Sequence, residues 1–303
     1  MSLTRRRFTQ ILASTLFLHH LPSFAQSVKF WASRTLPEAQ NITRIVSAGA
    51  PADLLLLAVA PEKMVGFSSF DFARQALIPL PEHIRQFPRL GRLAGRASTL
   101  SLEGLMALHP DLVVDCGNTD ETRISQARQV SEQTQIPWLL LNGKLEQSAE
   151  QLTTLGKTLG EEHRTAEQAN LASRFVGEAQ AFATSPAANL SFYAARGPRG
   201  LETGLQGSLH TEAAELLGLH NVAQIADRHG LTQVSMENLL RWQPDIILVQ
   251  EAVTADFIRR DPLWQGVKAV AEQRILFLSG LPFGWLDAPP GINRLLGLRR
   301  LHA

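Results

Sequence analysis

The chain has 303 residues, of which 45% are hydrophobic and 19% charged, a balance that suits a globular protein of one large domain or two lobes. Its formal charge of +1 is unevenly spread, because residues 1–25 hold three arginines and no acidic residue and so leave −2 for the rest. A body this close to neutral lacks the clustered cations that bind phosphates, and we expect no nucleic-acid partner.

The sequence contains one cysteine, Cys116. An internal disulfide and a metal site made of four cysteines are therefore both excluded. Because Cys116 follows the apolar run Leu112 to Val114, we expect a semi-buried thiol that packs against its neighbours and does not react.

The first 25 residues have the parts of an export signal. Consecutive arginines at 5–7 and Phe8 precede an apolar run over 11–18, and small residues at 23–25 form a cleavage pattern. This run is too short for a bilayer of about 30 Å, and no later run reaches the roughly 18 apolar residues of a membrane helix. The arginines resemble a twin-arginine signal, with a Sec signal as the alternative. With no cysteine near the cleavage point, we expect a soluble periplasmic protein that is not a lipoprotein.

Strands and helices alternate through the rest of the chain. In the first half we expect a strand and turn over 44–51, a helix over 52–59, a strand over 64–67, a helix over 100–108, and strands over 111–115 and 137–141. In the second half we expect a strand over 190–194, a helix over 208–217, and strands over 246–250 and 275–278. Such alternation predicts parallel pairing and an α/β fold.

A long helix is expected between the two halves. Residues 161–183 are rich in Ala, Glu, Gln and Arg and contain no proline, which predicts one helix of about 20 residues, about 30 Å long. Ser185 and Pro186 end it. A helix of this kind is a stiff strut, unlike a Gly/Ser linker. We therefore divide the chain into the export signal 1–25, an N-terminal lobe 41–145, a helical segment with the strut 146–185, and a C-terminal lobe 188–303.

One segment of the sequence is repeated. Residues 101–114 align without gaps on residues 235–248, and each copy has a serine N-cap, an early glutamate, a buried-face leucine and Pro-Asp before an apolar strand. Helix capping and the helix dipole account for the serine and the glutamate. They do not account for the recurrence of the whole unit 134 residues later. Two homologous lobes do.

The export signal, the motif S-x-E-x-L…P-D-[VLI] in both halves and the connecting helix together resemble the substrate-binding proteins of iron-complex and cobalamin ABC importers. These are the helix-strut class, or class III, of periplasmic binding proteins with an Fe/B12-binding domain. The resemblance covers about residues 44–301. It implies two Rossmann-like lobes joined by one long rigid helix, with the ligand in the cleft between them.

The same resemblance implies partners and a role. It implies a monomeric carrier, without enzymatic activity or a cofactor of its own, that delivers a small molecule to an inner-membrane permease homodimer with its ATPase. In that family one surface glutamate of each lobe docks onto permease arginines, and these residues map onto Glu103 and Glu237. Matched charges suit a pseudo-symmetric protein on a two-fold symmetric partner. The alternative is that both are only helix-start acids.

The cargo implied by the resemblance is a metal complex. Residues 193–212 and 282–298 resemble a metal-chelate branch of the family, and a ferric siderophore-type chelate is the commonest cargo of the family as a whole. Molybdate or tungstate, a nickel or cobalt chelate, haem and cobalamin remain alternatives.

Candidate ligand-binding residues follow strands in both halves, where open α/β sheets bind ligands. In the second half, Arg196 could hold an anion, His210 at the first turn of a helix could ligate a metal, Trp285 could cover a planar chelate, and Asp287 could ligate a metal. In the first half, Arg92 is a possible second cation and Phe67 a possible opposing wall. A surface salt bridge, core packing or turn formation are the alternative roles of these residues.

An enzyme is the main alternative to a carrier. The sequence contains no G-x-S-x-G, P-loop, H-E-x-x-H or post-strand G-x-G-x-x-G motif, so hydrolase, NTPase and dinucleotide-binding functions lack their usual parts. A metal-dependent periplasmic hydrolase would need several converging ligands, and the sequence offers mainly His210 and Asp287.

Overall fold

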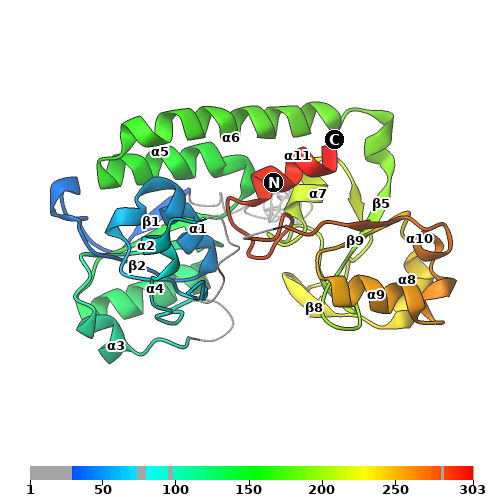
Figure 1. Ribbon diagram of the computed structural model, residues 1–303, viewed down its shortest axis with the longest axis horizontal. Helices are drawn as coiled ribbons and strands as arrows, with labels where there is room; N and C mark the ends of the chain where they lie inside the picture. The colour runs from blue at the N-terminus through cyan, green and yellow to red at the C-terminus, as the bar shows by residue number, and fades with distance from the viewer. Residues whose placement is uncertain (1–28, 74–79, 95–97, 281–282, 303) are drawn as a thin grey trace, which may run out of the picture.

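The structure is a computed structural model that describes residues 29–73, 80–94, 98–280 and 283–302. Residues 1–28, which hold the expected export signal, lie outside the described residues. Two α/β units lie side by side beneath one long helix, α6 (Glu162–Phe182), as Figure 1 shows. We call the unit that carries β1 to β4 the N-lobe and the unit that carries β5 to β10 the C-lobe.

The N-lobe is built on a four-stranded sheet in the order β1-β4-β3-β2. Its members are β1 (Phe30–Ala32), β2 (Ile45–Ser47), β3 (Leu112–Gly117) and β4 (Trp138–Asn142). Strands β2, β3 and β4 are parallel and buried throughout, whereas β1 pairs with the edge of β4 in the antiparallel sense. Parallel strands buried on both faces require helices on both sides.

The C-lobe sheet has the order β10-β9-β5-β7 and is parallel throughout. Its members are β5 (Ser191–Ala195), β7 (His220–Asn221), β9 (Ile246–Val249) and β10 (Ile275–Phe277). A separate antiparallel pair joins β6 (Glu202–Gly204) to β8 (Leu231–Gln233). These parallel sheets confirm the α/β fold expected from the sequence.

Helices cover the two sheets. The N-lobe has α1 (Ala50–Val59), α2 (Glu82–Arg85), α3 (Leu102–Ala107), α4 (Glu121–Thr134) and α5 (Ser148–Leu159), and the C-lobe has α7 (Glu212–Leu216), α8 (Met236–Trp242), α9 (Ala252–Arg260), α10 (Lys268–Ala271) and α11 (Arg294–His302). None of the described helices is both long and apolar enough to cross a membrane.

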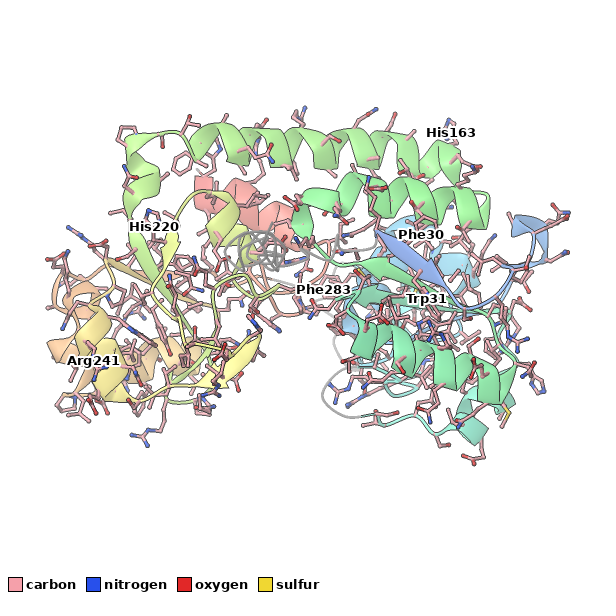
Figure 2. All side chains as sticks on the ribbon, turned by 180° about the vertical axis from the view of Figure 1, so that it is seen from behind. Phe30, Trp31, His163, His220, Arg241 and Phe283 are labelled. Atoms are coloured by element: carbon pink, nitrogen blue, oxygen red, sulfur yellow. The ribbon has the colours of Figure 1, made fainter. Side chains whose placement is uncertain are left out.

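The long helix α6 confirms the expected connection between the lobes. Near its start, Arg164 Nη1 donates to the carbonyl of Val59 at 2.7 Å. Near its end, Glu178 pairs with Arg299 of α11 at 3.1 Å. Figure 2 places His163 at one end of α6, above the N-lobe, and His220 of the C-lobe below the opposite end. Contacts near both ends therefore hold α6 to the two lobes.

The aspartate of the repeated segment has the same contact in both lobes. Asp111 Oδ2 accepts hydrogen bonds from the backbone N–H groups of Thr43 and Arg44, both at 2.8 Å, at the start of β2. Asp245 Oδ2 accepts from the N–H and hydroxyl of Ser191 at 2.9 and 2.7 Å, at the start of β5. Each aspartate thus fixes the beginning of the neighbouring parallel strand.

Two expected elements differ in the structure. Residues 64–67 do not form a strand, because Met64 and Phe67 each make only a single bridge, to Ile45 and Arg89. The helix expected over 208–217 begins only at Glu212, because Ser208 to Thr211 form successive turns. His210 therefore lies in a turn before α7 and not in its first turn.

Cys116 is more buried than expected. It lies on β3 with 4% of its surface exposed. Burial, and then the neighbouring carboxylate of Asp115, raise the pKa of the thiol to about 12. The thiol is therefore protonated near neutral pH, as a packing residue requires.

We predict that Asp245→Ala lowers the free energy of unfolding by about 2 kcal/mol, because it removes the acceptor of Ser191 and of Lys268 Nζ, 2.7 Å away. These contacts lower the pKa of Asp245, so the stabilisation is present at neutral pH and is lost as pH falls below the ordinary aspartate value of about 4. Urea unfolding at pH 7 and pH 3 measures both effects. Asp256→Ala, at an exposed aspartate on α9, is the control, and equal losses in the two variants would contradict the prediction.

A second prediction concerns Asp53 of α1, which is fully buried and accepts hydrogen bonds from Ser68 N–H and Oγ at 2.9 and 2.7 Å and from Ser47. Burial raises its pKa from 3.8 to about 6. The folded state therefore binds this proton more tightly than the unfolded state, and stability falls as pH rises through this window.

The difference in unfolding free energy between Asp53→Asn and the wild type should shift in favour of the variant by about 2 kcal/mol between pH 4 and pH 7. Subtracting the two urea curves at each pH removes the contribution of other groups. A difference that does not change with pH would contradict the assignment.

Candidate ligand-binding site

A cavity of about 520 Å³ lies between the two lobes. Its walls come from the start of α4 in the N-lobe and from the turn before α7 in the C-lobe, and its lining residues are Asn118, Asp120, Thr122, Arg123, Gln126, Leu209 and His210. The segment before α4 directly follows β3. The cavity is therefore at the carboxyl end of a parallel strand, the usual ligand position in open α/β sheets.

The N-lobe wall is fixed by one ion pair and one helix cap. Arg123 donates from Nε and Nη2 to the two carboxylate oxygens of Asp115, both at 2.8 Å, and Asp115 is 1% exposed. Asp120 Oδ1 accepts the Arg123 N–H at 2.9 Å and caps α4. The guanidinium is thus held in one orientation, with its charge matched by a carboxylate. Arg123, Asp115 and Asp120 were not predicted from the sequence, although Asp120 and Glu121 at the start of a helix just after a strand were a usable signal.

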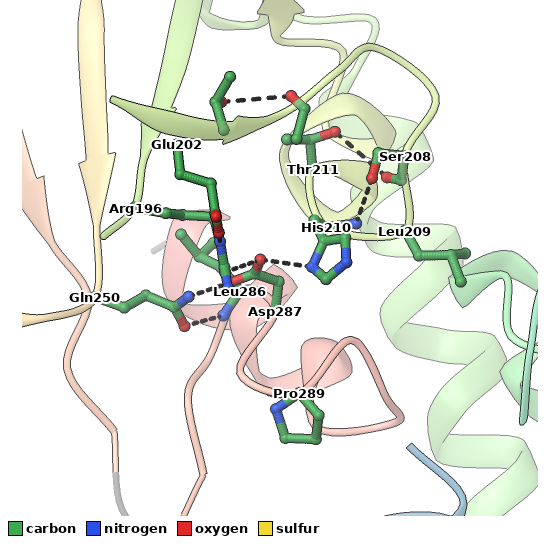
Figure 3. Close-up of polar contacts among 12 residues, drawn as sticks. Arg196, Glu202, Ser208, Leu209, His210, Thr211, Gln250, Leu286, Asp287 and Pro289 are labelled. Atoms are coloured by element: carbon green, nitrogen blue, oxygen red, sulfur yellow. Dashed lines mark hydrogen bonds and ion pairs between the residues drawn. The ribbon is translucent and has the colours of Figure 1, made fainter. Parts of the chain in front are cut away.

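Asp287 lies behind the C-lobe wall, where it contacts the lining residue His210 and is the centre of a group of polar contacts, as Figure 3 shows. It is 3% exposed and lies in the loop after β10. Its Oδ2 is 2.8 Å from Nδ1 of His210 and also accepts from Arg196, while its Oδ1 accepts from Gln250. Arg196 follows β5 directly and Gln250 follows β9 directly, so the carboxyl ends of adjacent strands bring these side chains together.

Arg196 is paired within the protein. Besides Asp287, its guanidinium meets Glu202, with Nε 3.4 Å from Oε1, and the two residues also exchange backbone hydrogen bonds. From the sequence, Arg196 was expected to be a cation that could receive an anionic ligand. In the structure the charge of Arg196 is already matched by two carboxylates.

Gln250 secures the loop that carries Asp287. Its amide nitrogen donates to Asp287, and its Oε1 accepts the backbone N–H of Leu286 at 2.9 Å. Gln250 was not predicted from the sequence. Its position as a polar residue at the end of a buried strand was the available signal.

Arg294 connects the C-lobe wall to the N-lobe. It is 1% exposed and donates to Glu212 Oε2 and to the carbonyls of Leu209 and Gly143 at 2.7, 2.7 and 2.6 Å. The other oxygen of Glu212 accepts the N–H of Leu145 at 3.0 Å. Gly143 and Leu145 follow β4, so this buried pair holds the His210 turn against the N-lobe.

Phe67 is a core residue and not a wall of the cleft. It has no exposed surface, and its ring meets those of Phe72, Phe87 and Phe70 edge-on at 5.3 to 5.9 Å. From the sequence, Phe67 was a candidate either for the wall opposite the ligand or for core packing, and its buried ring supports core packing. Phe283 of the C-lobe side, labelled in Figure 2, joins the same cluster at 5.1 Å from Phe70.

Trp285 and Arg92 are not among the residues that line the cavity. The indole of Trp285 donates to the carbonyl of Ser279, and the guanidinium of Arg300 on α11 lies 6.0 Å from its ring. Arg92 lies in a half-buried loop whose next residue, Leu93, donates to the carbonyl of Ala48 just after β2.

The two glutamates expected at the permease are exposed. Glu103 lies in the first turn of α3 and Glu237 in the first turn of α8, where it pairs with Arg241 at 2.9 Å. In Figure 1, α3 and α8 lie in different lobes and on the side away from α6. Within the described ranges, no three His, Cys, Asp or Glu side chains come together as a metal site.

Comparison with known proteins gives a family and a set of similar folds. Residues 45–280 match the family described as periplasmic binding protein. Curated protein sequences give no match. Among solved structures, an ABC transporter solute binding protein from Sulfurospirillum deleyianum DSM 6946 is 26% identical, with a TM-score of 0.76 over 89% of this chain and 88% of that chain.

Two further solved structures share the fold at lower identity. The molybdate periplasmic binding protein MolA of Haemophilus influenzae is 21% identical, with a TM-score of 0.66 over 88% of this chain and 86% of that chain. The vitamin B12 binding protein BtuF of Vibrio cholerae is 20% identical, with a TM-score of 0.65 over 86% of this chain and 95% of that chain. With two α/β lobes, a long connecting helix and a family match over most of its length, this chain belongs to the periplasmic binding protein family.

Proposed function

We propose that this protein is the periplasmic solute-binding component of an ABC importer and that its cargo is a metal chelate, most simply of the ferric siderophore type. The cavity between the lobes carries this proposal. Its volume of about 520 Å³ falls within the range of about 300–1,000 Å³ that is usual for small-molecule sites. A ligand there touches both lobes, so binding favours the arrangement in which they lie together.

The lining of the cavity favours a chelate over a free oxyanion. The guanidinium groups of Arg123 and Arg196 both pair with carboxylates, so the walls carry little uncompensated positive charge. Asn118, Thr122 and Gln126 are exposed polar side chains that can meet the oxygens of a chelator. Haem and cobalamin would call for aromatic walls, and Phe67 and Trp285 are engaged elsewhere.

We predict that a ferric chelate binds the protein with a Kd of about 1 μM, or about −8 kcal/mol, in an intrinsic fluorescence titration that uses the five tryptophans. The panel includes ferric chelates, nickel and cobalt chelates, molybdate, haem and cobalamin. The double substitution Thr122→Ala and Gln126→Ala should weaken binding about tenfold, because it removes two polar contacts from the wall.

Gln129→Ala is the matched control, since Gln129 is an exposed glutamine of the same helix outside the cavity lining. If molybdate bound most tightly of the panel, the cargo would be an oxyanion and not a metal chelate. If no member of the panel bound more tightly than about 1 mM, the proposed ligand class would be wrong.

We also propose that Glu103 and Glu237 dock the loaded protein onto the permease. Both are exposed, both occupy the first turn of the equivalent helix of the repeated segment, and each belongs to a different lobe. A permease homodimer with two-fold symmetry would present two equivalent basic positions to this pair.

Reversal of both charges, Glu103→Lys with Glu237→Lys, should abolish uptake by the complete importer while the Kd for cargo changes less than twofold. The control is Glu132→Lys with Glu167→Lys, which makes the same change of net charge at exposed positions on α4 and α6. Uptake assays in cells and titration of the purified variants give the two readouts. Loss of cargo binding in the first variant would place the glutamates in the binding site instead.

A further inference from the structure

The two ring nitrogens of His210 have different surroundings. Nδ1 lies 2.8 Å from Asp287 Oδ2, and the same carboxylate accepts a hydrogen bond from the guanidinium of Arg196. A carboxylate paired with a guanidinium is ionised and can only accept hydrogen bonds. Nδ1 therefore carries the proton, and in the neutral ring Nε2 keeps a free electron pair.

Nε2 is on the open side of the ring. His210 lines the interlobe cavity, and its side chain is 22% exposed. In Figure 3 the second ring nitrogen points away from Asp287. Among the described residues, Nε2 has no hydrogen-bond partner. The electron pair is thus available to whatever occupies the cavity.

The surroundings of His210 hold the ring in place. A histidine that binds a metal usually donates its other N–H to a carboxylate or carbonyl, which fixes the ring and makes the free nitrogen more basic. Asp287 supplies that carboxylate and is itself held by Arg196 and Gln250. The carbonyl of the preceding residue, Leu209, is bound by the buried Arg294 at 2.7 Å.

For a bound cargo, the free group at this wall is the electron pair of His210 Nε2, because the nearby arginines are already paired with carboxylates. Arg123 is engaged in a bidentate pair with Asp115, and Arg196 contacts both Asp287 and Glu202. An oxyanion needs unsatisfied cations or N–H donors, whereas a metal needs an electron pair. The donor set at this wall suits a metal.

We infer that His210 Nε2 binds the metal of the cargo directly, so that the cargo is a metal complex with at least one open or exchangeable coordination position. This inference rests on the proposed function, a carrier of metal complexes. One imidazole gives one bond, and the chelator supplies the other ligands. Asn118, Thr122 and Gln126 on the opposite wall then contact the chelator and not the metal.

Two nickel complexes test this inference on the purified protein. Nitrilotriacetate leaves two positions of octahedral Ni(II) open, and EDTA fills all six. Calorimetric titration should show that the nitrilotriacetate complex binds the wild type at least tenfold more tightly than the EDTA complex does. His210→Ala should remove this preference, while His220→Ala, at an exposed histidine of β7, should keep it.

Two further readouts separate metal binding from a structural role. With the Cu(II) nitrilotriacetate complex, electron spin echo envelope modulation should show the remote ring nitrogen of a bound imidazole. The amine nitrogen of the chelator does not give this signal, and we expect His210→Ala to abolish it and His220→Ala to retain it. Asp287→Asn should weaken binding of the nickel nitrilotriacetate complex by about 10- to 100-fold, the usual effect of losing a supporting carboxylate. Thermal unfolding of each variant checks that it is folded.

The outcomes distinguish this inference from the function it rests on. If both nickel complexes bind alike and His210→Ala binds them as the wild type does, the cargo is held through its chelator alone and the inference is wrong, while the proposed function stands. If His210→Ala binds a ferric chelate as tightly as the wild type does, the chelator alone holds the cargo and the inference is likewise wrong. If no metal complex binds the wild type more tightly than about 1 mM, both the inference and the proposed function fall.

Discussion

The candidate binding site depends on the buried ion pair between Arg294 and Glu212. A guanidinium that is 1% exposed needs a full set of acceptors, because an unpaired buried charge costs several kcal/mol. Arg294 finds them in both lobes, at Glu212 and Leu209 on one side and at Gly143 on the other. The hydrogen bonds that satisfy this one buried charge therefore hold the His210 turn against the edge of the N-lobe sheet.

The two walls of the cavity follow the same physical rule. Each has one arginine at the carboxyl end of a parallel strand or just beyond it, and each arginine pairs with a buried aspartate, Arg123 with Asp115 and Arg196 with Asp287. The pairs hold the two arginines rigidly and leave them no uncompensated positive charge. A rigid wall with one imidazole electron pair and several amide and hydroxyl groups suits a metal complex whose charge is already balanced by its chelator.

The sequence predicted those features that depend on neighbouring residues. Helix α6 was predicted from its composition, and the parallel strands were predicted from apolar runs. The serine caps, and the aspartates that bind the start of a neighbouring strand, were found because they belong to the repeated segment. Helix α4 was missed, because only Ile124, Ala127 and Ser131 of its residues are buried and its apolar period is weak. Residues Arg196, His210 and Asp287 were each proposed, but their mutual contacts join positions up to 91 residues apart and follow only from strand order. For Phe67 the sequence left two roles open, since an aromatic residue after a strand can face either the core or the cleft, and the structure shows the core.

The central claim is that a metal complex lies between α4 and His210. Anomalous diffraction at the metal absorption edge, from crystals of the protein loaded with a ferric chelate that it binds, tests this claim most directly. The account predicts one metal peak in the interlobe cavity, about 2.0–2.2 Å from His210 Nε2, a usual metal–imidazole bond length. A metal peak outside the cavity, or ligand density in the cavity without metal, would contradict it.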